Sequence, residues 1–219
     1  MNLLLPEHKA RALRSGQSGS IASRAGLPGT TARAKATHIF DRAAQDFYVE
    51  PEWCDDMLFA AEKFSGPVHD PACGIGRIVI AAIKTGHVAS GSDIIERSET
   101  RDFSFDYLSD NEPMSYANIV CNPPYRAARQ FIERALREAR KSAFLLQYGF
   151  MFGAERSAWL KTAPLKKVWI LAPRPSMPPG ELVLAGLKPG GGRIDYIWAV
   201  FERGHNGPPE IGWLIREVA

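Results

Sequence analysis

Apolar runs typical of strands alternate with helical periods from about residue 51 onward, and this alternation restricts the fold more than any other feature. Helical periods occupy 52–64, 77–86, 127–141 and 154–160. Strand-like runs occupy 87–94, 117–121, 142–148, 166–172 and 193–203, the stretch 68–76 begins as a strand and runs into a glycine turn, and a short segment lies at 103–108. Because a helix between two strands returns the chain to the same end of a sheet, we expect an α/β domain with a mostly parallel sheet and helices on both faces.

The length and composition favour one domain. With 219 residues, of which 45% are hydrophobic and 23% charged, the chain can bury one substantial core. No apolar run approaches the roughly 20 residues that cross a bilayer, and the opening stretch turns charged too early for a signal peptide or an anchor. The three cysteines (Cys54, Cys73, Cys121) are far apart and form no CxxC pair, so we expect a cytoplasmic protein without a metal site.

The net positive charge comes from the first 45 residues. Residues 1–45 hold seven basic and two acidic side chains, a net charge of +5, which leaves −2 for the remainder of the total of +3. This segment is rich in Gly, Ser and Thr and poor in large apolar residues, as in a flexible or loosely folded arm. A basic arm suits a polyanion such as DNA or RNA, and a solvated terminal tail is the alternative interpretation.

The stretch DPACGIG follows the first predicted strand and forms a glycine turn at its end. Glycines there let the backbone approach a ligand closely. A dinucleotide site requires a third glycine where Val79 stands, so that motif is incomplete. The chain contains no Gly-Lys-Ser/Thr sequence, so a P-loop is excluded. Asp93 ends the next strand, where an acid suits a ribose diol. The alternative is structural, with Asp70 capping the following helix and Gly74 and Gly76 serving the turn.

The stretch ANIVCNPPY runs a strand directly into two prolines. Proline lacks the backbone donor and has a fixed φ angle, so the strand ends there. Asn122, Pro123, Pro124 and Tyr125 then place a rigid turn, one amide side chain and one aromatic ring at the strand end, where ligands of parallel sheets bind.

In order and spacing, DPxCGxG followed by NPPY resembles motifs I and IV of the S-adenosylmethionine-dependent methyltransferases that modify exocyclic amines, most closely the small adenine-N6 DNA methyltransferases of phage or prophage type. The resemblance covers most of residues 46–203. It implies a Rossmann-like class I methyltransferase fold with a seven-stranded sheet, a methyltransferase domain over 46–219, S-adenosylmethionine as cofactor, and DNA as the substrate that receives N6-methyladenine.

The resemblance also implies roles for individual residues. The segment 46–51 looks like motif X, whose aromatic and polar residues contact the methionine part of the cofactor. Asp106 looks like the motif III acid that binds the cofactor's adenine, although an acid in such a segment is as often a turn residue. The cofactor-binding residues that it implies are Phe47, Tyr48, Asp70, Ala72, Gly74, Asp93, Ile94, Asp106, Tyr107 and Asn122.

The adenine amine is a weak nucleophile because its lone pair is delocalised into the ring. If the side-chain oxygen of Asn122 and the carbonyl of Pro123 accept its N–H bonds, the lone pair is freed to face the methyl group, and Tyr125 offers a ring on which the base stacks. We therefore assign the catalytic role to Asn122, Pro123, Pro124 and Tyr125. A base in a duplex must flip out to reach such a pocket.

The chain departs from sequence-specific members of this family in having only 94 residues after Tyr125, too few for a large target-recognition region. The candidates for substrate contact are the Pro/Gly-rich loop 173–193, the tip 147–156 with Phe150 and Phe152, and the basic arm. Three alternatives stay open: methyl transfer to guanine in RNA, methyl transfer to a protein glutamine, and a non-catalytic nucleic-acid-binding relic of the fold.

Overall fold

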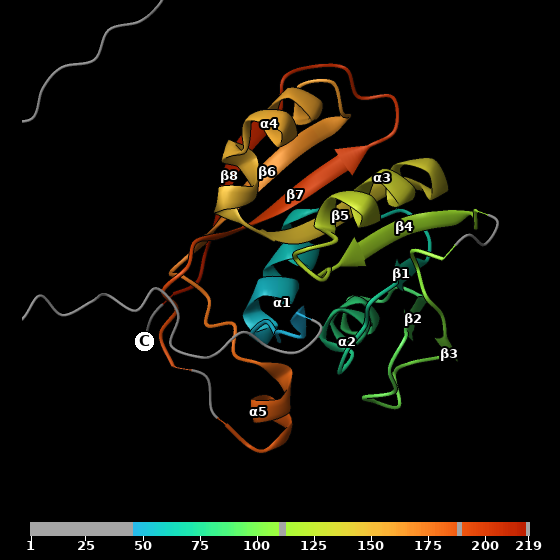
Figure 1. The fold of residues 1–219 in the computed structure, drawn as a ribbon, viewed down its shortest axis with the longest axis vertical. Coiled ribbons are helices and arrows are strands. Elements are labelled where there is room, and N and C mark those ends of the chain that lie inside the picture. Colours follow the sequence, from blue (N-terminus) through green and yellow to red (C-terminus); the bar gives the residue numbers. More distant parts are fainter. Residues whose placement is uncertain (1–45, 110–112, 188–189, 218–219) are drawn as a thin grey trace, which may run out of the picture. The chain divides into compact units, whose positions relative to one another are not determined.

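The structure, a computed structural model, describes residues 46–109, 113–187 and 190–217 (Figure 1). The basic arm predicted at 1–45 lies outside the described residues, and so does the domain boundary predicted after it. Among the described residues, no helix is long and apolar enough to cross a membrane.

The core of the described region is a single mixed sheet in the order β3-β2-β1-β4-β5-β7-β6-β8. Its strands are β1 (Val68–Asp70), β2 (Ala89–Asp93), β3 (Phe103–Ser104), β4 (Tyr116–Cys121), β5 (Ala139–Gln147), β6 (Leu165–Ala172), β7 (Tyr196–Glu202) and β8 (Glu210–Ile215). Every neighbouring pair is parallel except the two that involve β7, which runs antiparallel to β5 and to β6. The mostly parallel sheet is confirmed, but it has eight strands where seven were predicted.

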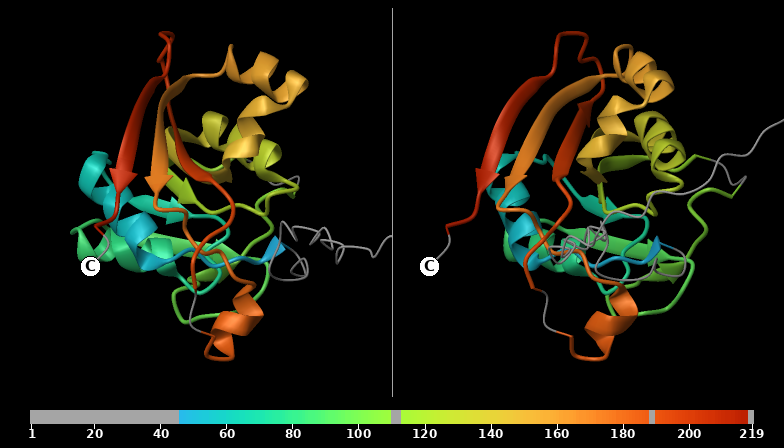
Figure 2. Two further views of the ribbon diagram at one scale, coloured as in Figure 1. Left: turned by 90° about the vertical axis from the view of Figure 1, so that its left-hand side faces the viewer. Right: turned by 60° about the vertical axis from the view of Figure 1, so that its left-hand side comes forward.

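Helices cover both faces of the sheet, as predicted (Figures 1 and 2). α1 (Glu52–Ala61) and α2 (Arg77–Lys84) pack on one face through side chains such as Leu58 and Ile78. α3 (Ala128–Glu138) and α4 (Ala154–Leu160) pack on the other through side chains such as Ile132 and Leu160. β7 lies between the two layers, and its residues 196–201 are all buried, which explains its uninterrupted apolar run.

Several element boundaries differ from the prediction. The helix predicted over 127–141 ends at Glu138, because β5 begins at Ala139 and pairs there with Tyr116 of β4. Three elements were not predicted: the 3₁₀ turn η2 (Tyr148–Phe152), the short helix α5 (Gly180–Leu184) inside the loop 173–193, and β8. β8 is an edge strand whose Leu214 packs into the core, whereas Ile211 and Trp213 are exposed.

The carboxyl ends of β1, β2 and β4 lie together at one edge of the sheet, because β1 pairs in parallel with both of the others. The segment 46–50 lies at this edge and pairs with residues of the loop 173–193. The N–H of Val49 donates to the carbonyl of Pro178 at 3.1 Å, and the N–H of Gly180 donates to the carbonyl of Phe47 at 2.9 Å. Two segments far apart in sequence are thereby joined beside the strand ends.

Candidate active site

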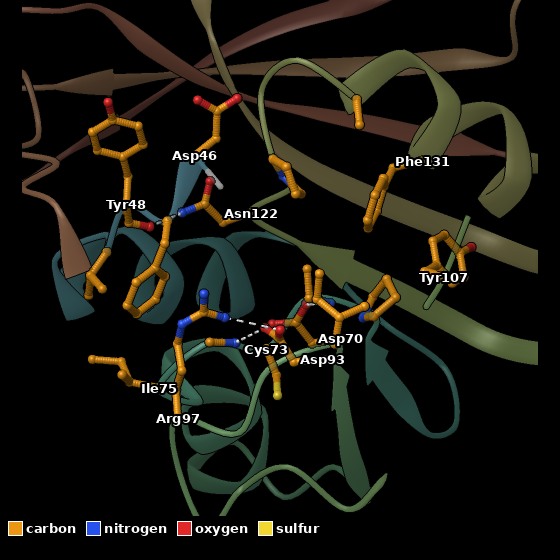
Figure 3. A pocket seen from close by; sticks show the side chains of 18 of the residues that line it. Asp46, Tyr48, Asp70, Cys73, Ile75, Asp93, Arg97, Tyr107, Asn122 and Phe131 are labelled. Atoms are coloured by element: carbon orange, nitrogen blue, oxygen red, sulfur yellow. Dashed lines mark hydrogen bonds and ion pairs between the residues drawn. The ribbon is translucent and has the colours of Figure 1, made fainter. Parts of the chain in front are cut away.

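A cavity lies at this edge of the sheet (Figure 3). Five stretches of chain line it: the segment 46–50, the glycine turn after β1, the end of β2, residues 105–108, and the chain from the NPPY turn into α3. Every residue predicted to bind the cofactor lines this cavity, and so does Pro124. Pro123 and Tyr125 are not among its lining residues. Positions as far apart in the sequence as Asp46 and Phe131 therefore line one cavity.

The turn after β1 is tight and depends on its glycines. Gly74 and Gly76 have φ angles of 52° and 81°, in the left-handed region that favours glycine. A Cβ on Gly74 would lie 3.0 Å from the ring of Phe47, so the missing side chain makes room for that ring. Asp70 stabilises the turn, because its Oδ1 accepts a hydrogen bond from the N–H of Ala72 at 3.1 Å.

Asp93 joins the end of β2 to the glycine turn. Its Oδ2 accepts a hydrogen bond from the N–H of Gly74 at 2.9 Å, and its Oδ1 accepts from the N–H of Ile95 at 2.9 Å and from Arg97 at 3.1 Å. A carboxylate oxygen can accept two hydrogen bonds, so the position of Oδ2 beside the cavity leaves capacity for a ligand hydroxyl.

Arg97 is a cavity residue that sequence reasoning missed. Its guanidinium lies 4.1 Å from the centre of the Phe47 ring while it bonds to Asp93, so it links the segment 46–50 to the end of β2 (Figure 3). The spacing of four residues from Asp93 was the available signal, but such spacing is common in solvated pairs outside any site.

The Asn122 amide is held on its nitrogen side. Its Nδ2 donates to the carbonyl of Tyr48 at 2.9 Å and to Oε2 of Glu50 at 2.7 Å. Glu50, which is 6% exposed and also lines the cavity, was not predicted as a site residue. Its only sequence signal was an acid inside the apolar and aromatic stretch FYVEP.

Tyr125 packs into the protein instead of lining the cavity. Its ring stacks on that of Tyr48, with centroids 5.9 Å apart and planes inclined by 20°, and its other neighbour is the ring of Tyr196 at 6.0 Å. Tyr48 does line the cavity. Of these two stacked rings, only Tyr48 belongs to a residue that lines the cavity, and the stacking role of Tyr125 stays a prediction.

In the segment 105–108, Asp106 has the contacts of a turn residue and also the position at the cavity that a cofactor-binding acid would need. The Oδ1 of Asp106 accepts a hydrogen bond from the N–H of Leu108 at 2.9 Å, which is a turn interaction, and the residue also lines the cavity. Tyr107 is 1% exposed and packs against the ring of Phe131 at 5.0 Å. Phe131 of α3, which was not predicted as a site residue, lines the cavity too.

Buried carboxyl groups surround the strand ends. Burial raises the pKa of Asp70 well above its usual range, and the carboxylate of Glu50 adds to that effect. Burial also raises the pKa of Glu50, against the opposing influence of its hydrogen bonds and of the Arg77 guanidinium. In the part of the chain that the structure describes, no group of three or more His, Cys, Asp or Glu side chains is arranged to hold a metal ion.

The sequence matches no protein-family model and no curated protein. Solved structures do match. One is a methyltransferase subunit of a type I restriction-modification system from Streptococcus thermophilus, with 12% identity over 80% of this chain and 48% of that chain and a TM-score of 0.53. A second is a protein from Pyrococcus horikoshii assigned as an RNA methyltransferase, with 13% identity over 68% and 83% of the two chains and a TM-score of 0.50.

A third match is the M protein of the type I restriction enzyme EcoKI, with 12% identity, 72% and 44% coverage and a TM-score of 0.50. The chain has the class I methyltransferase fold. It spans about half the length of the type I restriction-modification subunits that it matches. At this low identity the similarity establishes the fold alone.

Proposed function

We propose that this protein transfers a methyl group from S-adenosylmethionine to the exocyclic amine of adenine in DNA. The observation that carries the proposal is the Asn122 amide, which is held by its nitrogen at the edge of a cavity that the predicted cofactor segments line. An amide fixed in this way has its oxygen available as an acceptor for an amine. The NPPY turn and the glycine turn thus serve one cavity, as the motif assignment expects.

The cavity residues fit the cofactor. Asp93 at the end of β2 suits the hydroxyls of a ribose, and the glycine turn at Gly74 leaves room for a ligand close to the backbone. The apolar side chains of Leu108 and Phe131 suit an adenine ring, with Asp106 beside them. When bound, S-adenosylmethionine supplies the electrophilic methyl group.

The chain's own groups activate the amine. The side-chain oxygen of Asn122 and the carbonyl of Pro123 accept the two N–H bonds, which draws the lone pair out of conjugation with the ring. Since Pro123 is buried in a rigid turn, its carbonyl does not have to reorganise as positive charge develops on the nitrogen. Positioning and fixed dipoles then lower the barrier, and no nucleophile–base pair is required.

The surroundings of the cavity favour a nucleic acid over a protein as substrate. A second hollow adjoins the segment 46–50 at Pro51 and is lined by Trp53, Arg174, Arg216 and the backbone of glycines 190–192. Arginines beside an aromatic ring suit a phosphate backbone and an unstacked base. DNA is preferred because two of the three similar structures above belong to restriction systems, and RNA is the second candidate because the third is assigned to RNA.

The test is transfer of labelled methyl from S-adenosylmethionine to unmethylated genomic DNA, structured RNA and a protein extract in parallel, followed by identification of the modified unit. We expect N6-methyladenine in DNA.

Asn122→Ala is expected to keep the cofactor Kd within about threefold while lowering transfer at least ~100-fold, as for loss of one transition-state contact. Label found in RNA or protein would show that the same methyl transfer acts on that substrate instead of DNA. Activity of Asn122→Ala equal to that of the wild type would refute the mechanism.

A further inference from the structure

We propose that Glu50 is a positioning residue for methyl transfer, which holds the Asn122 amide in its productive orientation and strengthens its oxygen as an acceptor. The inference rests on the proposed function and assigns a role to a residue outside the recognised motifs. Glu50 does not have to touch the substrate in order to act. It acts through Asn122, to which it is hydrogen-bonded.

The geometry around the Asn122 amide fixes which end faces the substrate. An amide nitrogen has two hydrogens, and here the two acceptors are the Tyr48 carbonyl at 2.9 Å and Oε2 of Glu50 at 2.7 Å. Neither an ionised carboxylate nor a backbone carbonyl can donate a hydrogen bond. An amide turned by 180° would place its oxygen against both acceptors, so the nitrogen stays on the protein side and the oxygen is left for the amine.

The two acceptors are not equivalent, because only Glu50 carries a charge. A hydrogen bond to an ionised acceptor is shorter and about twice as strong as a neutral one. In a buried site such a bond also polarises the amide and increases the electron density on its oxygen. That oxygen is the atom that would accept an N–H bond as positive charge develops on the amine, so the carboxylate stabilises the transition state through the amide.

The location of Glu50 is costly for stability, which favours a functional explanation. The side chain is buried, and several titratable or charged groups face it from α1, the ends of β1 and β4, and α2. These groups are Cys54, Asp55, Asp70, Arg77, Cys121 and Tyr125. Arg77 is the cation among them, and burial outweighs it, so the pKa of Glu50 is raised. A buried carboxylate with a raised pKa destabilises the fold when it is ionised.

The experiment compares Glu50→Gln with the wild-type protein in methyl transfer to DNA, from about pH 5 to about pH 9. We expect kcat to fall about 10- to 100-fold in the variant, a range typical of partners that orient a catalytic ligand. The Kd for S-adenosylmethionine should stay within about threefold, and the melting temperature should not fall. Wild-type kcat should rise with pH as Glu50 loses its proton, and the variant should lack this limb.

Asp55→Asn is the matched control, because Asp55 is a buried carboxyl of the same neighbourhood with no hydrogen bond to Asn122. It should keep both the plateau kcat and the pH-dependent limb. Wild-type kcat in Glu50→Gln would overturn the inference, and so would a parallel loss of cofactor binding or of melting temperature, which would indicate a structural role. If the wild-type protein itself methylates no substrate, the proposed function is refuted. That outcome differs from one in which both the wild type and Glu50→Gln are fully active, which refutes only the role of Glu50.

Discussion

Asp55 illustrates the cost of the carboxyl groups buried beside the site. It lies in α1 with an exposed fraction of 0%, and neither of its oxygens has a hydrogen-bond partner among the described residues. Burial, reinforced by the nearby carboxylate of Glu50, raises its pKa well above the usual range. The folded protein therefore binds this proton more tightly than the unfolded chain does.

Asp55→Asn should accordingly stabilise the protein more at high pH than at low pH. When the pKa of a carboxyl group is raised on folding, the protein loses stability as the pH rises from the unfolded pKa through the folded pKa. Asparagine does not titrate, so the variant does not lose stability in this way. We expect the gain in unfolding free energy to be larger at about pH 8 than at about pH 5, by on the order of 1–2 kcal/mol. Urea denaturation at the two pH values measures it.

The exposed neighbour Asp56 provides the control for this prediction, since it lies on the same helix but outside the core. Asp56→Asn should show a smaller pH-dependent gain, because it removes only a nearby charge that adds to the raised pKa of Asp55 and leaves the buried carboxyl in place. Equal gains from the two variants at both pH values would contradict the assignment of the effect to burial.

At the same scale, some residues of the candidate site could be predicted from their places at strand ends, and others could not be predicted from the sequence. Asp70, Asp93 and Asn122 were predicted because each lies at the carboxyl end of a strand or directly after it, and parallel strands bring such positions together. Glu50 and Arg97 were not, because their roles depend on contacts between the segment 46–50 and strand ends that lie elsewhere in the sequence. A pattern read along one chain contains no such contacts.

At the scale of elements, the start of α5 packs against the segment 46–50, which lines the cavity. The Phe47 ring lies between Gly74 and Gly180, and a Cβ built on Gly180 would overlap that ring. The backbone bonds from Val49 to Pro178 and from Gly180 to Phe47 hold the two segments together. A small change on α5 should therefore affect the cavity directly.

Gly180→Ala should weaken cofactor binding by displacing Phe47. We expect the Kd for S-adenosylmethionine to rise about 10-fold, which corresponds to about 1.4 kcal/mol, with little change in melting temperature. Calorimetric titration measures the Kd. Gly191→Ala in the same loop is the control, because a Cβ there meets only open space. Unchanged binding in Gly180→Ala would show that Phe47 has no part in holding the cofactor.

The elements that sequence reasoning missed have weak local signals. α5 has five residues and follows a run of prolines, so its periodicity is too short to detect. β8 contains Gly212, which a Trp169 ring covers in the folded sheet, and exposes Ile211 and Trp213. These two apolar residues thus point outward, whereas an edge strand is expected to show polar residues on its exposed face.

At the scale of the whole molecule, the net positive charge and the cavity belong to different parts of the sequence. The cavity belongs to the part of the chain after residue 45, whose net charge is −2, and the first 45 residues carry +5. If the basic segment binds phosphates, it contributes affinity that depends on salt, while the cavity supplies the chemistry.

Deleting residues 1–40 should therefore flatten the salt dependence of DNA binding. The slope of log affinity against log salt is about −0.9 for each phosphate neutralised, so a loss of several contacts should reduce its magnitude by several units. Fluorescence anisotropy with a labelled duplex at a series of salt concentrations measures it. An unchanged slope would exclude the arm from binding, provided that the shortened protein still binds S-adenosylmethionine.

The position of β7 has a consequence for how the protein is made. β7 lies between β5 and β6 in the sheet although it follows both in the chain. On the ribosome, residues 46–131, which supply the cavity lining, emerge before β5 and β6, yet β6 cannot join the sheet until 196–202 have followed. Until then the nascent chain carries β5 with one unpaired edge, the kind of edge that chaperones and other unfinished chains recognise. The residues that line the cavity are thus translated before the strand that joins β6 to the rest of the sheet.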